Sequence, residues 1–188
     1  LTARPHAEGD KLVIAYEPLA TGSGYVSPSV LVEFGARSTG EPFERCPISC
    51  DAAEHILDIA FPEAVVRAMR PERTFWEKVT AIHVFCAQGE FRGGERFARH
   101  WHDIARLDAA GFARMALADH ALAATVARHK AIFFAERDPR GRRIDYQSSI
   151  SGALQLVPTG AALSGLAADY AAMVNDGLLL DEAEPFER

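Results

Sequence analysis

The chain has 188 residues, a formal net charge of −6 and 24% charged residues. At about 150 residues per domain, this length suggests one domain or two small lobes, able to bury a core without covalent cross-links. The hydrophobic fraction of 48% excludes wholesale disorder, and the acidic balance argues against a general nucleic-acid coat.

Cysteine content and hydropathy indicate the cellular compartment. The three cysteines, Cys46, Cys50 and Cys86, are sparse and odd in number, which fits reduced thiols better than a disulfide framework. Pro, Gly or charged residues interrupt every apolar stretch well before the roughly 18 residues that a membrane span requires. No signal peptide pattern is visible. We therefore expect a cytoplasmic protein that does not contact a membrane.

The first 70 residues are predicted to form the strand-rich part of the chain. Runs of β-branched and apolar residues between Gly and Pro breaks predict strands at 12–16, 30–34 and 64–69. An extended segment is expected at 42–49, and Asp51 is expected to cap a short helix that reaches residue 57.

Helical periodicity begins after residue 70. Thr74 and Glu77 form a capping box behind the Pro71 break, and apolar residues follow on one helical face up to Cys86. Further helices are predicted at about 95–108, at 117–135, and from a Thr159 cap to residue 174. The order predicts an α+β fold, with a small mixed β-sheet in residues 1–70 and a helical part in residues 71–188.

Lys78 is the first candidate for chemistry. It lies one turn into a capped helix, about 60° from the centre of the apolar stripe. A lysine at this border can reach a cleft and offer a compact charge to phosphate oxygens. The structural alternative is a lysine whose aliphatic stem covers the edge of the core.

A second candidate is the polar stripe of the next helix. Arg96, His100 and Asp103 fall at positions i, i+4 and i+7, and Arg99 is at ion-pair spacing from Asp103. A carboxylate among basic groups stays ionised and is able to orient a ligand, hold a lysine or act as a base. The alternative is a solvated face of weak ion pairs. A zinc site is not expected, because histidines at i and i+2, as at His100 and His102, do not converge on a helix.

Two more charged residues, Glu33 and Lys130, have both a functional and a structural interpretation. Glu33 interrupts the apolar run of residues 30–34, so its carboxylate either faces solvent or points into a site, where strand carboxylates commonly bind magnesium. Lys130 lies about 80° from the apolar stripe of its predicted helix, which is typical of a lysine at the border of a core.

Several motifs occur together in a characteristic order. Residues 69–83 (MRPERTFWEKVTAIH) precede RHWHDIARL at 99–107, ARHKAIFF at 127–134, a GALQLVP run at 152–158 and DYAAM at 169–173. In the first part, VLVEFGARSTGEPFE at 30–44 fits as well. From about residue 30 to residue 176, the chain resembles the AbiEii/AbiGii toxin family of nucleotidyltransferases.

The resemblance implies a nucleotidyltransferase fold of the polymerase-β type and a toxin of the abortive-infection, toxin–antitoxin kind. It implies transfer of a nucleotidyl group from a nucleoside triphosphate, with magnesium, to an acceptor for which RNA is a candidate, and a cognate antitoxin as partner. Lys78 and Asp103 match the family's lysine and aspartate motifs and are the expected catalytic residues. Arg99, His100 and Lys130 are the further candidates for nucleotide binding, and Glu33 is the candidate magnesium ligand.

The family's first motif, a Gly-Ser turn followed by an Asp-x-Asp pair, has no match in this chain. Gly22–Ser23 is not followed by such a pair, and the chain begins with Leu1 rather than Met. We expect the motif to lie upstream, in which case these residues do not catalyse alone. The alternatives are a module that binds a nucleotide or protein without catalysis, and a helical scaffold with a solvated polar stripe.

Two geometric expectations follow from these assignments. Lys78 and Asp103 should line one cleft that faces the sheet carrying Glu33. The aromatic residues of the helical part should belong largely to one apolar core; these are Trp76, Phe97, Trp101, Phe133 and Tyr170.

Overall fold

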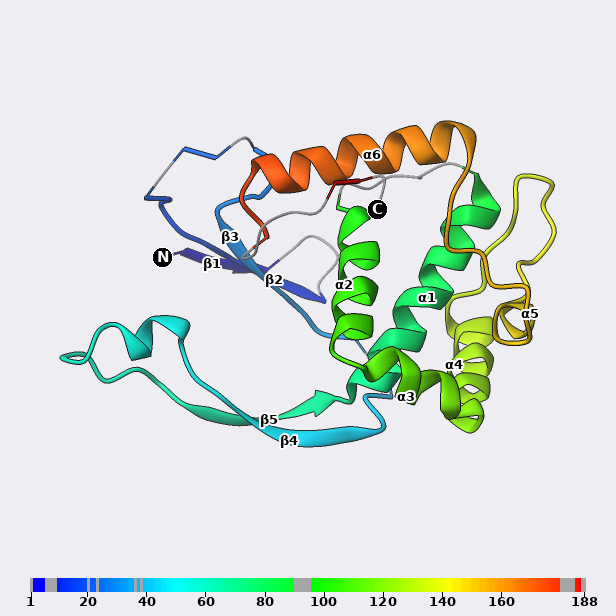
Figure 1. Cartoon of the computed structure of the whole chain (residues 1–188). Coiled ribbons are helices and arrows are strands. Elements are labelled where there is room, and N and C mark those ends of the chain that lie inside the picture. Colours follow the sequence, from blue (N-terminus) through cyan, green and yellow to red (C-terminus); the bar gives the residue numbers. More distant parts are fainter. Residues whose placement is uncertain are drawn as a thin grey trace.

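The computed structural model describes residues 2–5, 10–19, 21–22, 24–35, 37, 39–89, 96–179 and 185–186. Leu1 and Ser23, named above, lie outside this part, and so does residue 95, where the second helix was predicted to begin. Strands come first along the chain and helices follow, as Figure 1 shows. The predicted α+β class is therefore confirmed.

The described strands form two antiparallel sheets instead of the single mixed sheet that was expected. The first sheet has the order β1 (Thr2–Pro5), β2 (Lys11–Ala15), β3 (Ser29–Glu33), and Val13 lies opposite Leu31. The second is a ribbon of β4 (Phe43–Ile48) and β5 (Ala64–Met69), with a short 3₁₀ helix (Asp51–Glu54) between them. In Figure 1 this ribbon extends away from the helices.

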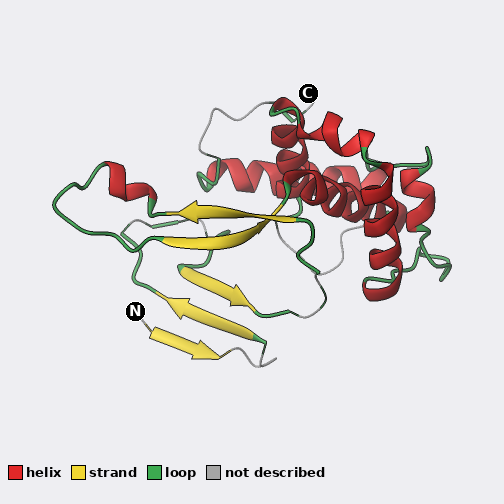
Figure 2. Ribbon diagram, turned by 90° about the horizontal axis from the view of Figure 1, so that it is seen from below, coloured by secondary structure: helices red, strands yellow, loops and turns green. Residues whose placement is uncertain are grey.

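Six helices follow β5 in the described part of the chain: α1 (Pro71–Gln88), α2 (Ala98–Ala109), α3 (Phe112–Ala118), α4 (His120–Phe133), α5 (Tyr146–Ile150) and α6 (Gly160–Asn175). Seen from below, the strands gather on one side of the molecule and the helices on the other (Figure 2). None of these helices has the length and apolar content that a membrane crossing requires.

Helix α1 begins earlier than its predicted capping box. The helix starts at Pro71, and the Thr74 hydroxyl donates to the carbonyl of Arg70 instead of capping. Proline at the first helical position already has the helical φ and lacks an N–H that would remain unpaired, so it sets the start one turn upstream. The helix ends at Gly89, which adopts the left-handed φ of 72° that favours glycine.

The predicted helix over 117–135 is divided into two. Asp119 separates α3 from α4, and its carboxylate accepts a hydrogen bond from the backbone N–H of Leu122 at 2.9 Å. An aspartate that caps a new helix competes with continuation of the previous one. The second predicted helix also starts later, at Ala98, so Arg96 precedes the helix and has a φ of 70°.

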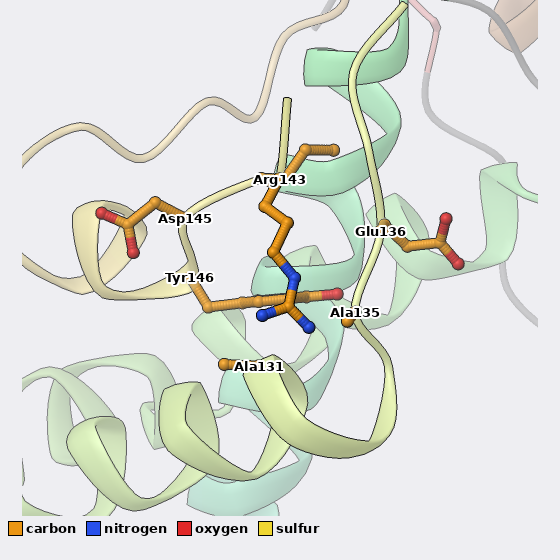
Figure 3. A pocket seen from close by; sticks show the side chains of 7 residues that line it. Ala131, Ala135, Glu136, Arg143, Asp145 and Tyr146 are labelled. Atoms are coloured by element: carbon orange, nitrogen blue, oxygen red, sulfur yellow. The ribbon is translucent and has the colours of Figure 1, made fainter. Parts of the chain in front are cut away.

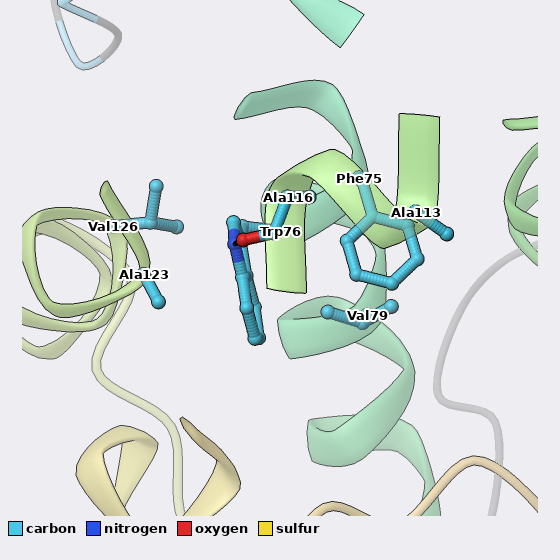
Figure 4. Close-up of a cluster of buried hydrophobic side chains, with 7 residues drawn as sticks. All are labelled: Phe75, Trp76, Val79, Ala113, Ala116, Ala123 and Val126. Carbon is cyan, nitrogen blue, oxygen red and sulfur yellow. Dashed lines mark hydrogen bonds between the residues drawn. The ribbon is translucent and has the colours of Figure 1, made fainter. Parts of the chain in front are cut away.

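The main apolar core lies around α1. Phe75, Trp76 and Val79 pack against buried alanines of α3 and α4, and the Trp76 indole N–H donates to the carbonyl of Ala116 at 3.0 Å (Figure 4). In the described residues, every fully buried side chain comes from α1 or from a later segment. The division into parts 1–70 and 71–188 coincides with the β5–α1 junction, and as a division into domains it stays a prediction.

The expectation of one common aromatic core is wrong in part. Trp76 belongs to the core around α1, but Trp101 and Tyr170 pack against a separate cluster formed by Ala98, Leu166 and Met173. Phe97 packs edge-on against Phe85, with 4.5 Å between ring centroids. Phe133 is 50% exposed, because α4 turns that side of its last turn to solvent.

Asp169 of α6 joins three separate segments. Its Oδ1 accepts from the Tyr25 hydroxyl and from the Arg96 backbone N–H, both at 2.8 Å, and its Oδ2 accepts from the Ala98 N–H at 2.7 Å. A carboxylate suits the start of a helix because several N–H groups there lack partners inside the helix. Asp169 therefore fixes where α2 begins and holds it under α6, which crosses that end of α2 in Figure 1.

We predict that Trp76→Ala lowers the free energy of unfolding by about 3–5 kcal/mol, because it empties the core around α1. Phe133→Ala should cost less than about 1 kcal/mol, as ordinary surface changes do. Urea unfolding monitored by circular dichroism measures both values. Equal losses in the two variants would contradict this division of the aromatic residues.

Candidate active site

The candidate site is centred on an ion pair between α1 and α2. The Nζ of Lys78 lies 2.5 Å from the Oδ2 of Asp103, although the two residues are 25 positions apart in the chain. The side chain of Lys78 is 23% exposed and that of Asp103 is 39% exposed, so a ligand can reach both. The predicted proximity of these two residues is confirmed, while their catalytic roles stay a prediction.

His100 lies one turn before Asp103 on α2 and belongs to the same environment. Burial, together with the nearby charges of Lys78 and Arg99, lowers the pKa of His100 to about 4. Its Nδ1 is buried and bonds to no described residue, and its ring lies against Phe85. The imidazole is therefore neutral at physiological pH and adds no charge beside Lys78.

Lys130 of α4 pairs with a carboxylate of α1. Its Nζ lies 2.7 Å from the Oε2 of Glu77, and the other oxygen of Glu77 accepts from Arg73 at 2.9 Å. Arg73 also donates to the backbone carbonyl of Glu41, just before β4. Lys130 thus belongs to a buried charge network, and its nucleotide-binding role stays a prediction.

Arg99 and Glu33 lie outside the Lys78–Asp103 contact. Arg99 is exposed on α2. Glu33 is 61% exposed at the end of β3 and pairs with Lys11 at 3.2 Å. Its described contacts therefore fit the solvated alternative, and its role as a magnesium ligand stays a prediction.

The described residues do not fit a magnesium site. Among them, no group of three or more His, Cys, Asp or Glu side chains is arranged to hold a metal ion. The carboxylate of Asp103 is paired with Lys78, and that of Glu33 is paired with Lys11. Magnesium usually requires one or two carboxylates that are open to it, with water and substrate phosphates completing the shell.

Sequence reasoning missed two carboxylates that position the site. The capping-box pattern assigns Glu77 only a local role at the helix start, although Arg73 and Glu77 stand at the i, i+4 spacing of an ion pair. Asp169 was part of the DYAAM motif without an assigned role, and nothing in its local pattern indicates that it caps a helix 71 residues away.

A separate small cavity of about 210 Å³ lies near the end of α4 (Figure 3). Its polar lining comes from Glu136, Arg143, Asp145 and Tyr146. The Tyr146 hydroxyl donates to the carbonyl of Phe134 at 2.6 Å, and burial raises its pKa to about 12. None of the predicted site residues lines this cavity, so it is distinct from the Lys78–Asp103 site.

Comparison with known proteins gives one result. A family model described as "Nucleotidyl transferase AbiEii toxin, Type IV TA system" matches residues 2–188. No curated protein and no solved structure matches the chain.

We predict an acid-dependent loss of stability that depends on His100. Its pKa is about 4 in the folded state against an ordinary value of 6.5, so between these values the unfolded state binds more protons. Stability should therefore fall as the pH drops from about 6.5 towards 4, and His100→Gln should reduce this dependence. Urea unfolding at several pH values measures it, with the exposed His120→Gln as the control. An unchanged pH dependence in His100→Gln would refute the assignment.

We also predict that Glu77→Ala lowers the free energy of unfolding by about 3 kcal/mol, because it leaves the Arg73 and Lys130 cations without their carboxylate. Glu54→Ala, on the exposed 3₁₀ helix, is the matched control and should cost less than about 0.5 kcal/mol. Chemical denaturation gives both numbers. If the two variants were equally stable, the network would not hold the helices together.

Proposed function

The chain belongs to the AbiEii nucleotidyl transferase toxin family of type IV toxin–antitoxin systems, and from this premise we propose that Lys78 and Asp103 form part of its reaction centre. The proposed reaction transfers a nucleotidyl group from a nucleoside triphosphate to an acceptor, for which we propose RNA. Membership of a toxin–antitoxin family implies an antitoxin partner.

The contact between Lys78 and Asp103 is the observation that carries this proposal. Two helices that start 27 residues apart bring one cation and one carboxylate together at a partly exposed position. A purely structural pair gains little from such exposure, since surface ion pairs contribute only about 0–1 kcal/mol. A lysine held ready at a ligand-accessible surface is instead suited to receive phosphate oxygens.

In the proposed reaction, an acceptor hydroxyl oxygen attacks the α-phosphorus of the triphosphate. A new P–O bond forms, the bond to the pyrophosphate oxygen breaks, pyrophosphate leaves with the electron pair, and the hydroxyl proton passes to water. Negative charge increases on the phosphate oxygens during this step, and the Lys78 ammonium group stabilises it. Asp103 positions Lys78 before the ligand arrives, which avoids reorganisation during the reaction.

The neutral state of His100 has a consequence for this site. A protonated imidazole would repel Lys78 and compete with it for Asp103. Because burial keeps His100 uncharged, Lys78 remains the cation that pairs with Asp103 at neutral pH. Members of nucleotidyl transferase families typically use a divalent metal, but the described carboxylates do not fit one, so no step here is assigned to it.

We predict that Lys78→Ala reduces transfer by about a hundredfold, equivalent to roughly 3 kcal/mol of transition-state stabilisation. The measurement is transfer of each radiolabelled nucleoside triphosphate in turn to a pool of RNA, by the full protein that the gene encodes. Asp103→Ala should have a similar effect, and the double variant should lose less than the product of the two.

Arg114→Ala, an exposed arginine on α3, serves as the control and should retain full activity. Thermal melts of every variant separate loss of chemistry from loss of folding. Full transfer by Lys78→Ala would refute the proposal. Triphosphate binding that depends on Lys78, without transfer to any acceptor, would also refute it and favour a binding module.

A further inference from the structure

A second, larger cleft lies beside the Lys78–Asp103 contact, between α2 and the end of α6. Its volume is about 380 Å³. Arg96, Arg99, His102 and Arg106 line it from the α2 side, while Met173 and Leu178 line it from the α6 side. Its two walls therefore differ in chemistry, one basic and the other apolar.

The basic wall is unusual for this protein. The chain has a net charge of −6, yet the described lining of the cleft contains three arginines against one carboxylate, Asp103. Arg99 and His102 bond to no acceptor among the described residues, which leaves their donors available. Guanidinium groups recognise phosphate through paired N–H donors, so this wall is suited to a phosphate-bearing ligand.

The apolar wall fits a different part of a ligand. Met173 is buried in the cluster under α6, whereas Leu178 is 42% exposed and presents its side chain to the cleft. A flat apolar group placed here would remove this surface from water. A phosphate group joined to a base or ribose is a ligand with both properties.

The backbone of the basic wall at Arg96 is held in a defined conformation. Arg96 adopts a left-handed φ of 70°, which is strained for a residue other than glycine. The Asp169 carboxylate accepts from its N–H at 2.8 Å and from the N–H of Ala98 at 2.7 Å. Strained residues that are over-determined by their surroundings often lie at binding sites.

Asp103 connects the cleft to the proposed reaction centre. It lines the cleft and also pairs with Lys78. We propose that the cleft binds a nucleotide unit of a substrate, with its phosphates on Arg99 and its base against Leu178. This inference rests on the proposed function, and the unit belongs either to the incoming triphosphate or to the acceptor strand.

Direct binding to the full protein tests the cleft without requiring catalysis. Two fluorescent probes distinguish the sources: α,β-methylene nucleoside triphosphates, which cannot transfer, and a single-stranded RNA of ten nucleotides. Arg99→Ala should weaken binding of one probe about tenfold, as loss of a charge-assisted contact does. For the RNA, the slope of the logarithm of the binding constant against the logarithm of the salt concentration should also become shallower by about one unit, which corresponds to one phosphate contact.

Leu178→Ala should lower the affinity for the same probe several-fold, because the base contacts this wall. Inorganic triphosphate has no base, so its ability to displace the probe should be unchanged. Arg128→Ala, an exposed arginine on α4, is the matched control and should bind as the unaltered protein does. The proposal is overturned if Arg99→Ala and Arg128→Ala bind both probes equally, or if neither probe binds the unaltered protein at millimolar concentration.

The outcome is separable from that of the proposed function. Transfer that depends on Lys78, combined with binding that is indifferent to Arg99, would retain the reaction centre and reject the cleft. Binding that depends on Arg99 and Leu178, without any transfer, would retain the cleft and reject the reaction.

Discussion

The carboxylate of Glu77 accepts from Arg73 on its own helix and from Lys130 on α4, while Arg73 also reaches the backbone of Glu41. These contacts fix the rotation of α1 about its axis and tie it to the segment before β4. Successive residues of a helix point about 100° apart, so fixing Glu77 towards α4 directs Lys78 towards α2. The position of the candidate lysine is thus a consequence of a buried charge network in which it takes no part.

Asp169 positions the α2 side of the site, as Glu77 positions the α1 side. By holding the N–H groups of Arg96 and Ala98, it determines where α2 starts and how its side chains meet α1 and α6. Asp103 then faces Lys78 on one side and the basic cleft on the other. Two carboxylates from different helices, Glu77 and Asp169, therefore help to position the Lys78 cation and the Asp103 carboxylate.

Periodicity predicted the helix faces better than the helix ends. The border position of Lys78 on α1 and of Asp103 on α2 follows from a 100° rotation per residue, and both residues lie where that rotation puts them. Helix ends depend on competing caps: Pro71 moved the start of α1 upstream of Thr74, and Asp119 divided one predicted helix into α3 and α4. The strand at 64–69 has the bounds that were predicted, and Pro62 and Pro71 stand on either side of it.

The amino-acid sequence by itself determined the order of strands and helices, the α+β class and the family, because these depend on local periodicity and on motifs in series. Only the tertiary structure decided which charges are paired. Lys78 pairs with Asp103, Lys130 pairs with Glu77, and Lys11 pairs with Glu33. An ion pair forms where packing brings the two charged groups close together. The number of residues between them in the chain does not predict their distance in space. For the same reason, the sequence alone did not predict the cleft. Its basic wall at α2 and its apolar wall at the end of α6 come together only in the folded chain.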